Sequence, residues 1–366
     1  MKVTLFRAFP DSYRQSMSVY GDRLLAALRS LLPPGDEAIA FLPRHVFLGP
    51  RPARYWAQYI GYQFGVPFAQ GDVNHVIDHA YGHLLHTLDS ARTVVTFHDA
   101  IGLKARHGHL GHSGGDRSLS LVQRYNLSGL RKAAAVICDS EASRKDFLDY
   151  AGYPPEQIDV ISPGVDTSFF EPLDSDPKSR LGLAPGRYLL HVGHTRFYKN
   201  IPALFHVLAI LTKSLGYDVK LLKVGEAFTP EQERLAKELG VKDRITHLGK
   251  VADDLLPDVY RCADVLLFPS WYEGFGLPVI EAMASGVPVV ASDRGSLPEV
   301  VGDAGVLVDP EDHETMAKSV ATIFDDAGFR AKLREAGLER ARLFTWEKTA
   351  KRTLEVYRKV YQANQR

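Results

Sequence analysis

The chain has few cysteines, no excess of charge of either sign and no long hydrophobic run. Cys138 and Cys262 lie in apolar surroundings far apart in the sequence, which predicts small buried side chains in a reducing compartment rather than a redox or metal site. Lysine plus arginine equals aspartate plus glutamate at 44 each, which argues against general nucleic-acid binding but leaves a local basic patch open. No apolar run approaches the roughly 20 residues that span a bilayer, and the N-terminus is typical of a strand rather than a signal peptide. We therefore expect a cytoplasmic protein, with peripheral contact to the cytoplasmic face of a membrane left open.

The first half also lacks the glycine-rich turn of a dinucleotide-binding domain. After an apolar run at 3–8, the segment 9–21 offers only Gly21. Without a G-x-G-x-x-G pattern at this turn, a dinucleotide site in the first half loses its best support.

What the sequence contains is an alternation of short apolar strands and helices over 366 residues, 45% of them hydrophobic. This alternation predicts an α/β protein with parallel sheets flanked by helices, long enough for two domains. Strands are expected at 3–8, 38–42, 73–77, 92–97, 134–138, 187–192, 219–224, 245–248, 263–268, 287–291 and 305–308. Helices are expected at 16–31, 117–130, 255–260 and 278–285, and others begin near 139, 201, 229, 310 and 345. We expect a first domain over 1–170, a linker over 171–182, a second domain over 183–345 and a final helix over 346–366.

The most informative stretch is 269–286, between two of the expected strands. Pro278 suits the first position of a helix and Gly286 suits the position just past its end. Backbone N–H groups before such a helix are unpaired and lie at the positive end of its dipole. The sequence therefore predicts an anion site formed by Gly274, Phe275, Gly276 and Leu277.

Two glutamates flank this predicted anion site, Glu273 in the loop and Glu281 in the expected first turn of the helix. A carboxylate beside a phosphate would repel it, so both make sense as acceptors of hydrogen bonds from hydroxyl groups. A diphosphate between two sugars would supply such hydroxyls. The alternative is that Glu281 only complements the helix dipole and that Glu273 is a solvated loop residue.

The pattern EGFGLPVIEAMASGVPVVAS at 273–292, continued by DRGSLPEV at 293–300, closely resembles the signature of the family 4 glycosyltransferases. The resemblance extends more weakly over nearly the whole chain. It implies a retaining enzyme with the GT-B fold: two Rossmann-like domains facing across a cleft, with a C-terminal helix that crosses back to the first domain. The apolar residues of that last helix are expected to be packing surface.

A basic segment follows the strand expected at 187–192. A glycine between strand and helix lets the backbone approach an anion, and Arg196 and Lys199 add cationic donors. The segment resembles the Gly…Lys-Asn element of the family, whose basic residues hold the donor diphosphate. The family often has arginine where this chain has His194 or Tyr198, so Arg196 is expected to substitute. The alternative is ordinary surface charge at a helix start. The resemblance implies that Gly193 and His194 belong to the donor site.

Three further residues are assigned by the resemblance. His98, at the end of a strand, would lie against the transferred sugar, and Lys250 and Val251 would flank the nucleobase. The alternatives are that His98 is a structural histidine with its hydrogen bonds satisfied and that Lys250 is simply exposed.

The loop 104–116, rich in glycine and histidine, cannot pack a core and is expected to be a mobile flap. A metal site formed by four nearby histidines is the less favoured interpretation, because the local sequence is strand-like. They are His75, His79, His83 and His86.

The sequence thus predicts a retaining hexosyltransferase that moves a hexose, mannose favoured, from a nucleotide-diphosphate sugar to a glycan, lipid-linked or small-molecule acceptor. GDP-mannose is favoured over a UDP-hexose on family frequency alone. Lys199, Arg196 and the helix N-terminus would stabilise the leaving diphosphate, Glu273 would orient the hexose and Glu281 would hold the ribose. No Asp-x-Asp pattern stands where it would hold a metal, so we expect no cofactor and no metal. A sugar-nucleotide epimerase, a phosphorylase or a non-catalytic nucleotide-sugar-binding protein remain alternatives, and the oligomeric state is open.

Overall fold

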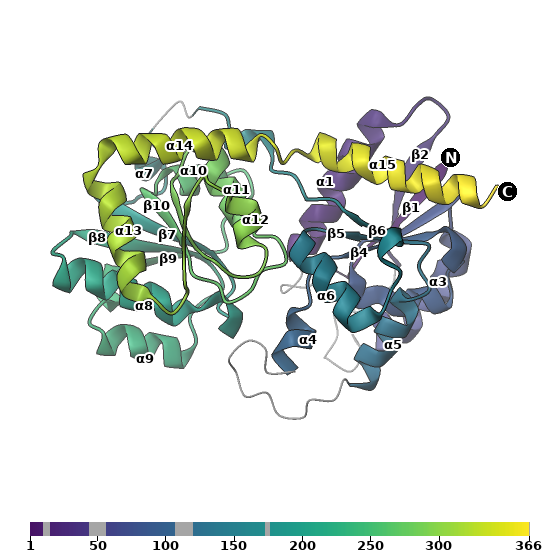
Figure 1. Cartoon of the computed structure of the whole chain (residues 1–366), viewed down its shortest axis with the longest axis horizontal. Coiled ribbons are helices and arrows are strands. Elements are labelled where there is room, and N and C mark those ends of the chain that lie inside the picture. Colours follow the sequence, from purple (N-terminus) through teal and green to yellow (C-terminus); the bar gives the residue numbers. More distant parts are fainter. Residues whose placement is uncertain (10–14, 44–55, 107–119, 173–175, 366) are drawn as a thin grey trace. The chain divides into compact units, whose positions relative to one another are not determined.

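The computed structural model describes residues 1–9, 15–43, 56–106, 120–172 and 176–365. The chain divides into two compact units (Figure 1). Unit 1 combines Met1–Gly164 with Trp346–Arg366, and unit 2 is Val165–Thr345. Most of the expected flap at 104–116 and residues 173–175 of the expected linker lie outside the described residues.

Unit 1 is a six-stranded parallel sheet with the strand order β2-β1-β3-β4-β5-β6. Its strands are β1 (Lys2–Phe6), β2 (Glu37–Phe41), β3 (Val73–Val76), β4 (Thr93–Phe97), β5 (Ala135–Cys138) and β6 (Ile158–Val160). Its α-helices are α1 (Gln15–Leu31), α3 (Tyr62–Ala69), α4 (Ile101–Arg106), α5 (Leu121–Leu130), α6 (Glu141–Ala151) and α15 (Trp346–Ala363). Shorter helical turns are η1 (Ala57–Gly61), η2 (His79–His86), η3 (Ser90–Arg92) and η4 (Pro155–Gln157).

The last helix, α15, packs on unit 1 beside α1 (Figure 1). Its buried residues Leu354, Tyr357 and Val360 join one core with Val3 and Leu5 of β1. The expectation that the C-terminal helix returns to the first half is therefore confirmed. No helix among the described residues combines the length and the apolar character needed to cross a membrane.

Unit 2 is a second six-stranded parallel sheet, with the order β12-β11-β10-β7-β8-β9. Its strands are β7 (Arg187–Gly193), β8 (Val219–Gly225), β9 (Ile245–Gly249), β10 (Val265–Phe268), β11 (Val289–Ser292) and β12 (Val306–Val308). Its α-helices are α7 (Pro177–Arg180), α8 (Ile201–Ala209), α9 (Pro230–Glu238), α10 (Leu256–Arg261), α11 (Leu277–Ala284), α12 (Leu297–Val301), α13 (His313–Asp325) and α14 (Ala327–Ala341). Shorter turns are η5 (Thr167–Phe169), η6 (Phe197–Lys199), η7 (Ile210–Ser214) and η8 (Lys242–Arg244).

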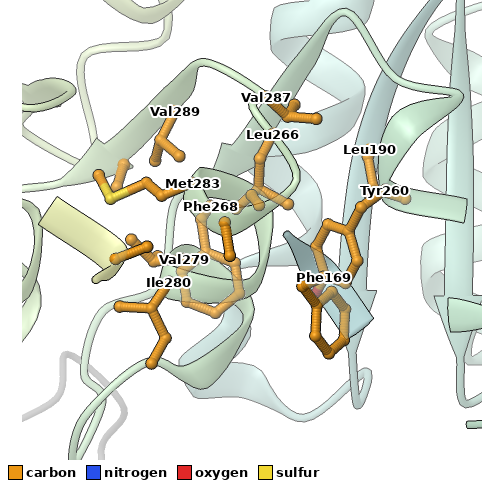
Figure 2. Close-up of a cluster of buried hydrophobic side chains, with 14 of the residues drawn as sticks. Phe169, Leu190, Tyr260, Leu266, Phe268, Val279, Ile280, Met283, Val287 and Val289 are labelled. Atoms are coloured by element: carbon orange, nitrogen blue, oxygen red, sulfur yellow. The ribbon is translucent and has the colours of Figure 1, made fainter. Parts of the chain in front are cut away.

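Both faces of the unit 2 sheet are covered, as a parallel sheet requires. Leu190 and Leu266 face one core, shown in Figure 2 with Val279, Ile280 and other side chains of that cluster. Their neighbours Leu189 and Leu267 join the opposite core with α8 and α13. This alternation explains why the strands are nearly continuous apolar runs. Cys138 and Cys262 are free and buried, as the sequence predicts.

Local sequence sets most helix ends close to expectation. α11 follows Gly276, whose φ of 104° lies in the left-handed region and where a Cβ would meet Leu297 Cδ2 at 2.9 Å. α9 has the expected capping box of Thr229 and Gln232. The expected helix start at Pro310 is wrong. α13 begins at His313 because the Asp312 side chain accepts a hydrogen bond from the Thr315 amide and caps the helix there.

Candidate functional site

Two loops of unit 2 leave the sheet at neighbouring strand ends. β7 ends at Gly193 and β10 ends at Phe268, and the two strands are hydrogen-bonded to each other. From here the chain runs from β7 to β8 on one side and from β10 to β11 on the other. Parallel sheets bind ligands beyond the carboxyl ends of strands at such a switch point. Two of the three segments that the sequence predicts to hold site residues in this unit, those after β7 and β10, emerge there.

The two loops are joined by a buried ion pair. Lys199 Nζ lies 2.7 Å from Glu273 Oε1, and each side chain is only 9% exposed. Lys199 Nζ also lies 4.9 Å from the centre of the Phe268 ring, and the Trp271 amide donates to the Tyr198 carbonyl at 2.8 Å. The structure thus brings together two predicted site residues that are 74 positions apart. The interpretation of Glu273 as a solvated loop residue is wrong, because the side chain is buried against Lys199.

The loop that carries Glu273 is held from behind by Ser296. Its hydroxyl is 3.1 Å from the Glu273 carbonyl oxygen and 2.8 Å from the Phe275 carbonyl oxygen. A Cβ at Gly295 would lie 3.0 Å from the backbone of Glu273. Sequence reasoning named neither Gly295 nor Ser296 as a site residue. Their signal was present, because both lie in the stretch 293–300 that continues the family resemblance.

The predicted anion site lies where the structure starts α11. Gly276 is the N-cap residue, and no side-chain hydrogen bond caps this helix. Gly274 and Leu277 are partly exposed, whereas Phe275 and Gly276 are buried. The positive end of the helix dipole therefore lies next to the Lys199–Glu273 pair, in a setting that favours an anion.

Glu281 is not in the first turn of α11, so that part of the prediction is wrong. The helix begins at Leu277, which puts Glu281 in its second turn. Its carboxylate accepts a hydrogen bond from the Tyr260 hydroxyl at 2.5 Å. Burial raises its pKa to about 7, against the opposing effect of the Tyr260 hydrogen bond and with smaller contributions from Asp253 and Asp166. The position of Glu281 therefore excludes a role as partner of the dipole of α11. A contact of Glu281 with the ribose stays a prediction.

The basic element after β7 is anchored by Glu226. The Glu226 carboxylate accepts hydrogen bonds at 3.1 Å from both the amide and the hydroxyl of Thr195, which lowers its pKa. His194 Nδ1 lies 3.8 Å from the same carboxylate, and burial lowers the pKa of His194. Arg196 is exposed and is the N-cap residue of η6. Arg196 and His194 are thus placed on the same loop as Lys199, and their roles stay predictions.

Sequence reasoning missed Lys223, a fully buried lysine in β8. Its Nζ donates to three backbone carbonyls, those of Gly193 at 2.7 Å, Val224 at 2.7 Å and Glu226 at 3.2 Å. The ends of β7 and β8 approach each other closely here, since a Cβ added at Gly225 would lie 2.4 Å from the Gly193 carbonyl oxygen. A charged residue inside an apolar strand was the signal that could have identified it.

His191 of β7 is a second buried base that was missed. Its Nδ1 lies 3.3 Å from the Leu267 carbonyl oxygen and must be the donor, because a carbonyl only accepts. Its Nε2 has no hydrogen-bond partner within the described parts of the chain. Burial, with the nearby Lys223 and Lys199, holds its pKa well below the usual value. The ring is therefore neutral, and Nε2 carries an unused lone pair.

Lys250 and Val251 follow β9 at the edge of the sheet. Lys250 is exposed, and Val251 packs partly against the core that contains α11. The exposure of Lys250 agrees with the alternative that it is an ordinary surface lysine. It does not test a contact with the nucleobase.

His98 lies in unit 1, at the end of β4, and is buried. Nδ1 is 2.6 Å from Asp139 Oδ2, and Nε2 is 2.7 Å from the Ile77 carbonyl oxygen. Burial lowers the pKa of His98, but the Asp139 charge and its hydrogen bond outweigh this and raise the pKa to about 9. The imidazolium therefore donates from both nitrogens within unit 1. Its predicted contact with a transferred sugar is untested.

The four histidines that could have formed a metal site have separate partners. His75 bonds Thr96 and Tyr357, and His83 bonds Asn126 and the Gln58 carbonyl. Among the residues that the structure describes, no group of three or more histidine, cysteine, aspartate or glutamate side chains could hold a metal ion.

Two family models match the chain in succession. The model described as "Glycosyltransferase Family 4" matches residues 21–169, and that described as "Glycosyl transferases group 1" matches residues 178–340. The first match falls within unit 1 apart from its last residues, and the second falls within unit 2.

Curated relatives carry glycosyltransferase names. D-inositol 3-phosphate glycosyltransferase of Salinispora tropica is 34% identical over 62% of this chain and 51% of its own length. The chain thus spans about half the length of that relative. O-antigen chain mannosyltransferase B of Escherichia coli is 31% identical over 75% of this chain and 72% of its own length.

Solved structures support the fold. Sucrose-phosphate synthase from Thermosynechococcus elongatus has a TM-score of 0.80 at 23% identity and covers 99% of this chain and 100% of its own. Anabaena HepE in complex with UDP and glucose has a TM-score of 0.74 at 20% identity and covers 97% of this chain and 98% of its own. From the family models, the Escherichia coli relative and this shared architecture it follows that the chain belongs to the family 4 glycosyltransferases and has their GT-B fold.

Proposed function

We propose that the protein is a retaining hexosyltransferase that uses a nucleotide-diphosphate sugar. The observation that carries the proposal is the buried Lys199–Glu273 pair at the switch point of the unit 2 sheet. A buried lysine beside an uncapped helix N-terminus suits a diphosphate, and a carboxylate next to it suits sugar hydroxyls. A donor that carries both groups would replace the mutual contact of the two side chains.

The chemistry follows from the leaving group. As the bond from the hexose to the diphosphate breaks, negative charge grows on the departing oxygen. Lys199, Arg196 and the N–H groups before α11 would stabilise that charge. Glu273 would orient the hexose hydroxyls, and the departing phosphate would take the proton of the acceptor hydroxyl. We expect these cationic groups to act without a metal ion, so activity should survive EDTA, and loss of activity that added metal restores would contradict this.

Mannose is the favoured hexose. Two relatives carry mannosyltransferase names, O-antigen chain mannosyltransferase B and MMP alpha-(1->4)-mannosyltransferase of Mycolicibacterium hassiacum. GDP-mannose is therefore the first donor to test. The Anabaena complexes with UDP and UDP-glucose keep a UDP-hexose as the second choice.

The decisive experiment combines donor binding with product analysis. A thermal-shift screen of GDP-mannose, UDP-glucose and other nucleotide sugars should identify the donor, because a ligand that binds only the folded state raises its stability. Incubation of that donor with glycan, lipid-linked and small-molecule acceptors should then yield a glycoside, whose anomeric configuration is read by NMR. Inversion would contradict the retaining mechanism. Epimerised donor without acceptor, sugar phosphate formed from glycan and phosphate, or binding without turnover would each favour one of the alternatives.

We also propose a cytoplasmic protein that touches a membrane surface. Four large apolar side chains at intervals of four residues are exposed along residues 56–68, namely Trp56, Ile60, Phe64 and Phe68. The segment 56–69 carries no charged residue, and its opposite side, at Tyr62 and Val66, is buried. Exposed aromatic side chains on such a helix suit the interface of a bilayer.

This contact is tested by co-sedimentation with anionic liposomes. The variant with Phe64→Ser and Phe68→Ser should lose binding, whereas Leu343→Ser, at an exposed leucine of unit 2, should keep it. Equal binding by all three proteins, or by none, would contradict the proposal.

A further inference from the structure

A buried hydrogen bond joins α10 to α11. The Tyr260 hydroxyl of α10 donates to Glu281 Oε2 of α11 at 2.5 Å. The Tyr260 side chain is wholly buried, and among the described residues its hydroxyl has no second hydrogen-bond partner. A buried hydroxyl needs a partner, and the partner of Tyr260 is a carboxylate on the helix that begins at the predicted anion site.

The Tyr260 ring is held in place by its neighbours. It packs edge-on against Phe169 of η5, with ring centres 5.6 Å apart and ring planes at 74° (Figure 2). The next residue of α10, Arg261, donates through Nη2 to the carbonyl oxygens of Ser168 and Phe169. α10 and η5 are thus fastened together, and the hydroxyl of Tyr260 has a fixed position relative to α11.

The Glu281 carboxylate has one oxygen bound and one oxygen open. Oε1 makes no hydrogen bond with any described residue and is not fully buried. The side chain is partly exposed, as is Leu277 four residues earlier, whereas Val279 and Ile280 between them are buried. Residues four apart lie on one face of a helix. Glu281 therefore shares the open face of α11 with the predicted anion site, about one turn or 5.4 Å further along the helix.

The chemistry of this carboxylate suits a pair of neighbouring hydroxyl groups. A carboxylate accepts hydrogen bonds at about four positions on its two oxygens. With the proton of Tyr260 at one of them, the plane of the carboxylate is fixed, and each oxygen still has a free position. The 2′ and 3′ hydroxyl groups of a ribose would each donate to one of the two oxygens. One helical turn suits the distance between such a ribose and the diphosphate attached to it.

We propose that Tyr260 is a positioning residue that holds the Glu281 carboxylate in the orientation that binds both ribose hydroxyl groups of the donor. The protein would thereby prefer ribonucleotides to nucleotides that lack these hydroxyl groups. This inference rests on the proposed function for the presence of a nucleotide, and on the predicted contact of Glu281 with its ribose. Tyr260 itself does not touch the nucleotide.

Calorimetric titration of the full-length protein with GDP, UDP and their 2′,3′-dideoxy analogues tests the inference. At pH 8 the Glu281 carboxylate is mostly ionised, because burial raises its pKa only to about 7. The wild type should bind the ribonucleotide about tenfold or more tightly than its dideoxy analogue, because hydrogen bonds to a charged acceptor are lost with the hydroxyl groups.

Tyr260→Phe should lower this affinity ratio by about threefold or more, mainly by weakening the binding of the ribonucleotide, because the carboxylate is no longer held in one orientation. Tyr188→Phe is the matched control and should leave the ratio unchanged. Tyr188 belongs to the same core, and its hydroxyl donates to the Ala184 carbonyl oxygen instead of a carboxylate.

A double-mutant cycle separates positioning from a purely structural role. Glu281→Ala should bring the ratio close to one, and adding Tyr260→Phe should then change it no further, because the tyrosine acts only through the carboxylate. Thermal unfolding shows which variants are folded. If Tyr260→Phe does not fold, Glu281→Asp takes its place, since it withdraws the carboxylate by one methylene group. It should also lower the ratio, and an unchanged ratio would overturn the inference.

The outcomes distinguish this inference from the proposed function. A preference for the ribonucleotide that Tyr260→Phe leaves unchanged overturns the positioning role alone. Equal affinity of the wild type for ribonucleotides and dideoxy analogues overturns the ribose contact and the positioning role, while the proposed function stands. Failure of both GDP and UDP to bind overturns the proposed function as well.

Discussion

Lys199 and Glu273 each neutralise a charge that would be costly to bury alone. Breaking such a pair by removing one partner typically costs about 3–5 kcal/mol, because the other charge stays buried. The pair is therefore weak support for stability and stronger support for function, since buried titratable pairs gather at functional sites and the proposed donor would use both charges.

We predict that Lys199→Ala lowers turnover by about a hundredfold or more, because one charge-stabilising donor is lost at the leaving group. Steady-state kinetics with the donor found by screening would measure this. Circular dichroism and thermal unfolding must show that the variant is folded, because Glu273 loses its partner. Lys237→Ala on the exposed side of α9 is the control and should be unaffected. Near-normal turnover of Lys199→Ala would remove this residue from the site.

His98 predicts a pH dependence of the stability of unit 1. Its pKa is about 9 in the folded protein, above the ordinary value of 6.5. Its contribution to stability is therefore complete below about pH 6.5 and is lost as the pH rises through 9, and it amounts to about 3 kcal/mol. Chemical denaturation of the wild type and Asp139→Asn between pH 6 and 10 would measure it.

The stability difference between these two proteins should shrink as the pH rises. Because only the difference is used, groups of opposite pH dependence do not interfere. A difference that stays constant with pH would contradict a charged His98–Asp139 pair.

At the scale of elements, α15 is attached to unit 1 by more than apolar packing. The Tyr357 hydroxyl lies 2.6 Å from His75 Nδ1, and His75 Nε2 lies 2.7 Å from Thr96 Oγ1. Burial lowers the pKa of His75 to about 3, so its ring is neutral. A helix at the end of the chain is thus tied by a buried hydrogen-bond network to two central strands, β3 and β4.

We predict that Tyr357→Phe destabilises the protein by about 1–3 kcal/mol, because it leaves a buried histidine nitrogen without a partner. Urea denaturation followed by circular dichroism would measure the loss. Tyr361→Phe on the same helix is the control, since the Tyr361 hydroxyl makes no hydrogen bond with any described residue, and it should change stability little. Equal effects of the two substitutions would contradict the network.

At the scale of the whole molecule, the chain leaves unit 1 at Gly164, builds unit 2 and returns to unit 1 at Trp346. Unit 1 is therefore incomplete until the last residues are present. Unit 2 is continuous, and its sheet and both of its cores come from its own segment.

We predict that a chain ending at Thr345 loses the fold of unit 1 but keeps that of unit 2. Each of Leu354, Tyr357 and Val360 buries apolar surface worth about 1.5–3 kcal/mol, which together approach the stability of a whole domain. Hydrogen exchange should show loss of protection confined to residues 1–164. A chain shortened only to Asn364, just past α15, is the control. Unchanged protection of unit 1 in the chain ending at Thr345 would contradict the prediction.

Much of the architecture could be predicted because it depends on local pattern. Apolar runs such as 263–268 and 287–291 became β10 and β11, and Pro278 and Gly286 marked α11 to within one residue. Pro310 gave a wrong start for α13, because the Asp312 side chain, two residues later, caps the helix and decides where it begins. The 3.6-residue periodicity could not predict that Glu281 lies in the second turn of α11. A shift of the helix start by one residue, from Pro278 to Leu277, decides the turn in which Glu281 falls.

The sequence by itself determined the two α/β halves, the family resemblance and the residue types of the site, because strand pattern, turn residues and a long motif are properties of neighbouring positions. Only the tertiary structure decided which charges meet. The pairing of Lys199 with Glu273, the burial of Lys223 under the Gly193 loop and the bonding of both His98 nitrogens depend on strand order. Strand order joins residues far apart in the chain, and the burial that shifts their pKa values exists only once the sheet is packed.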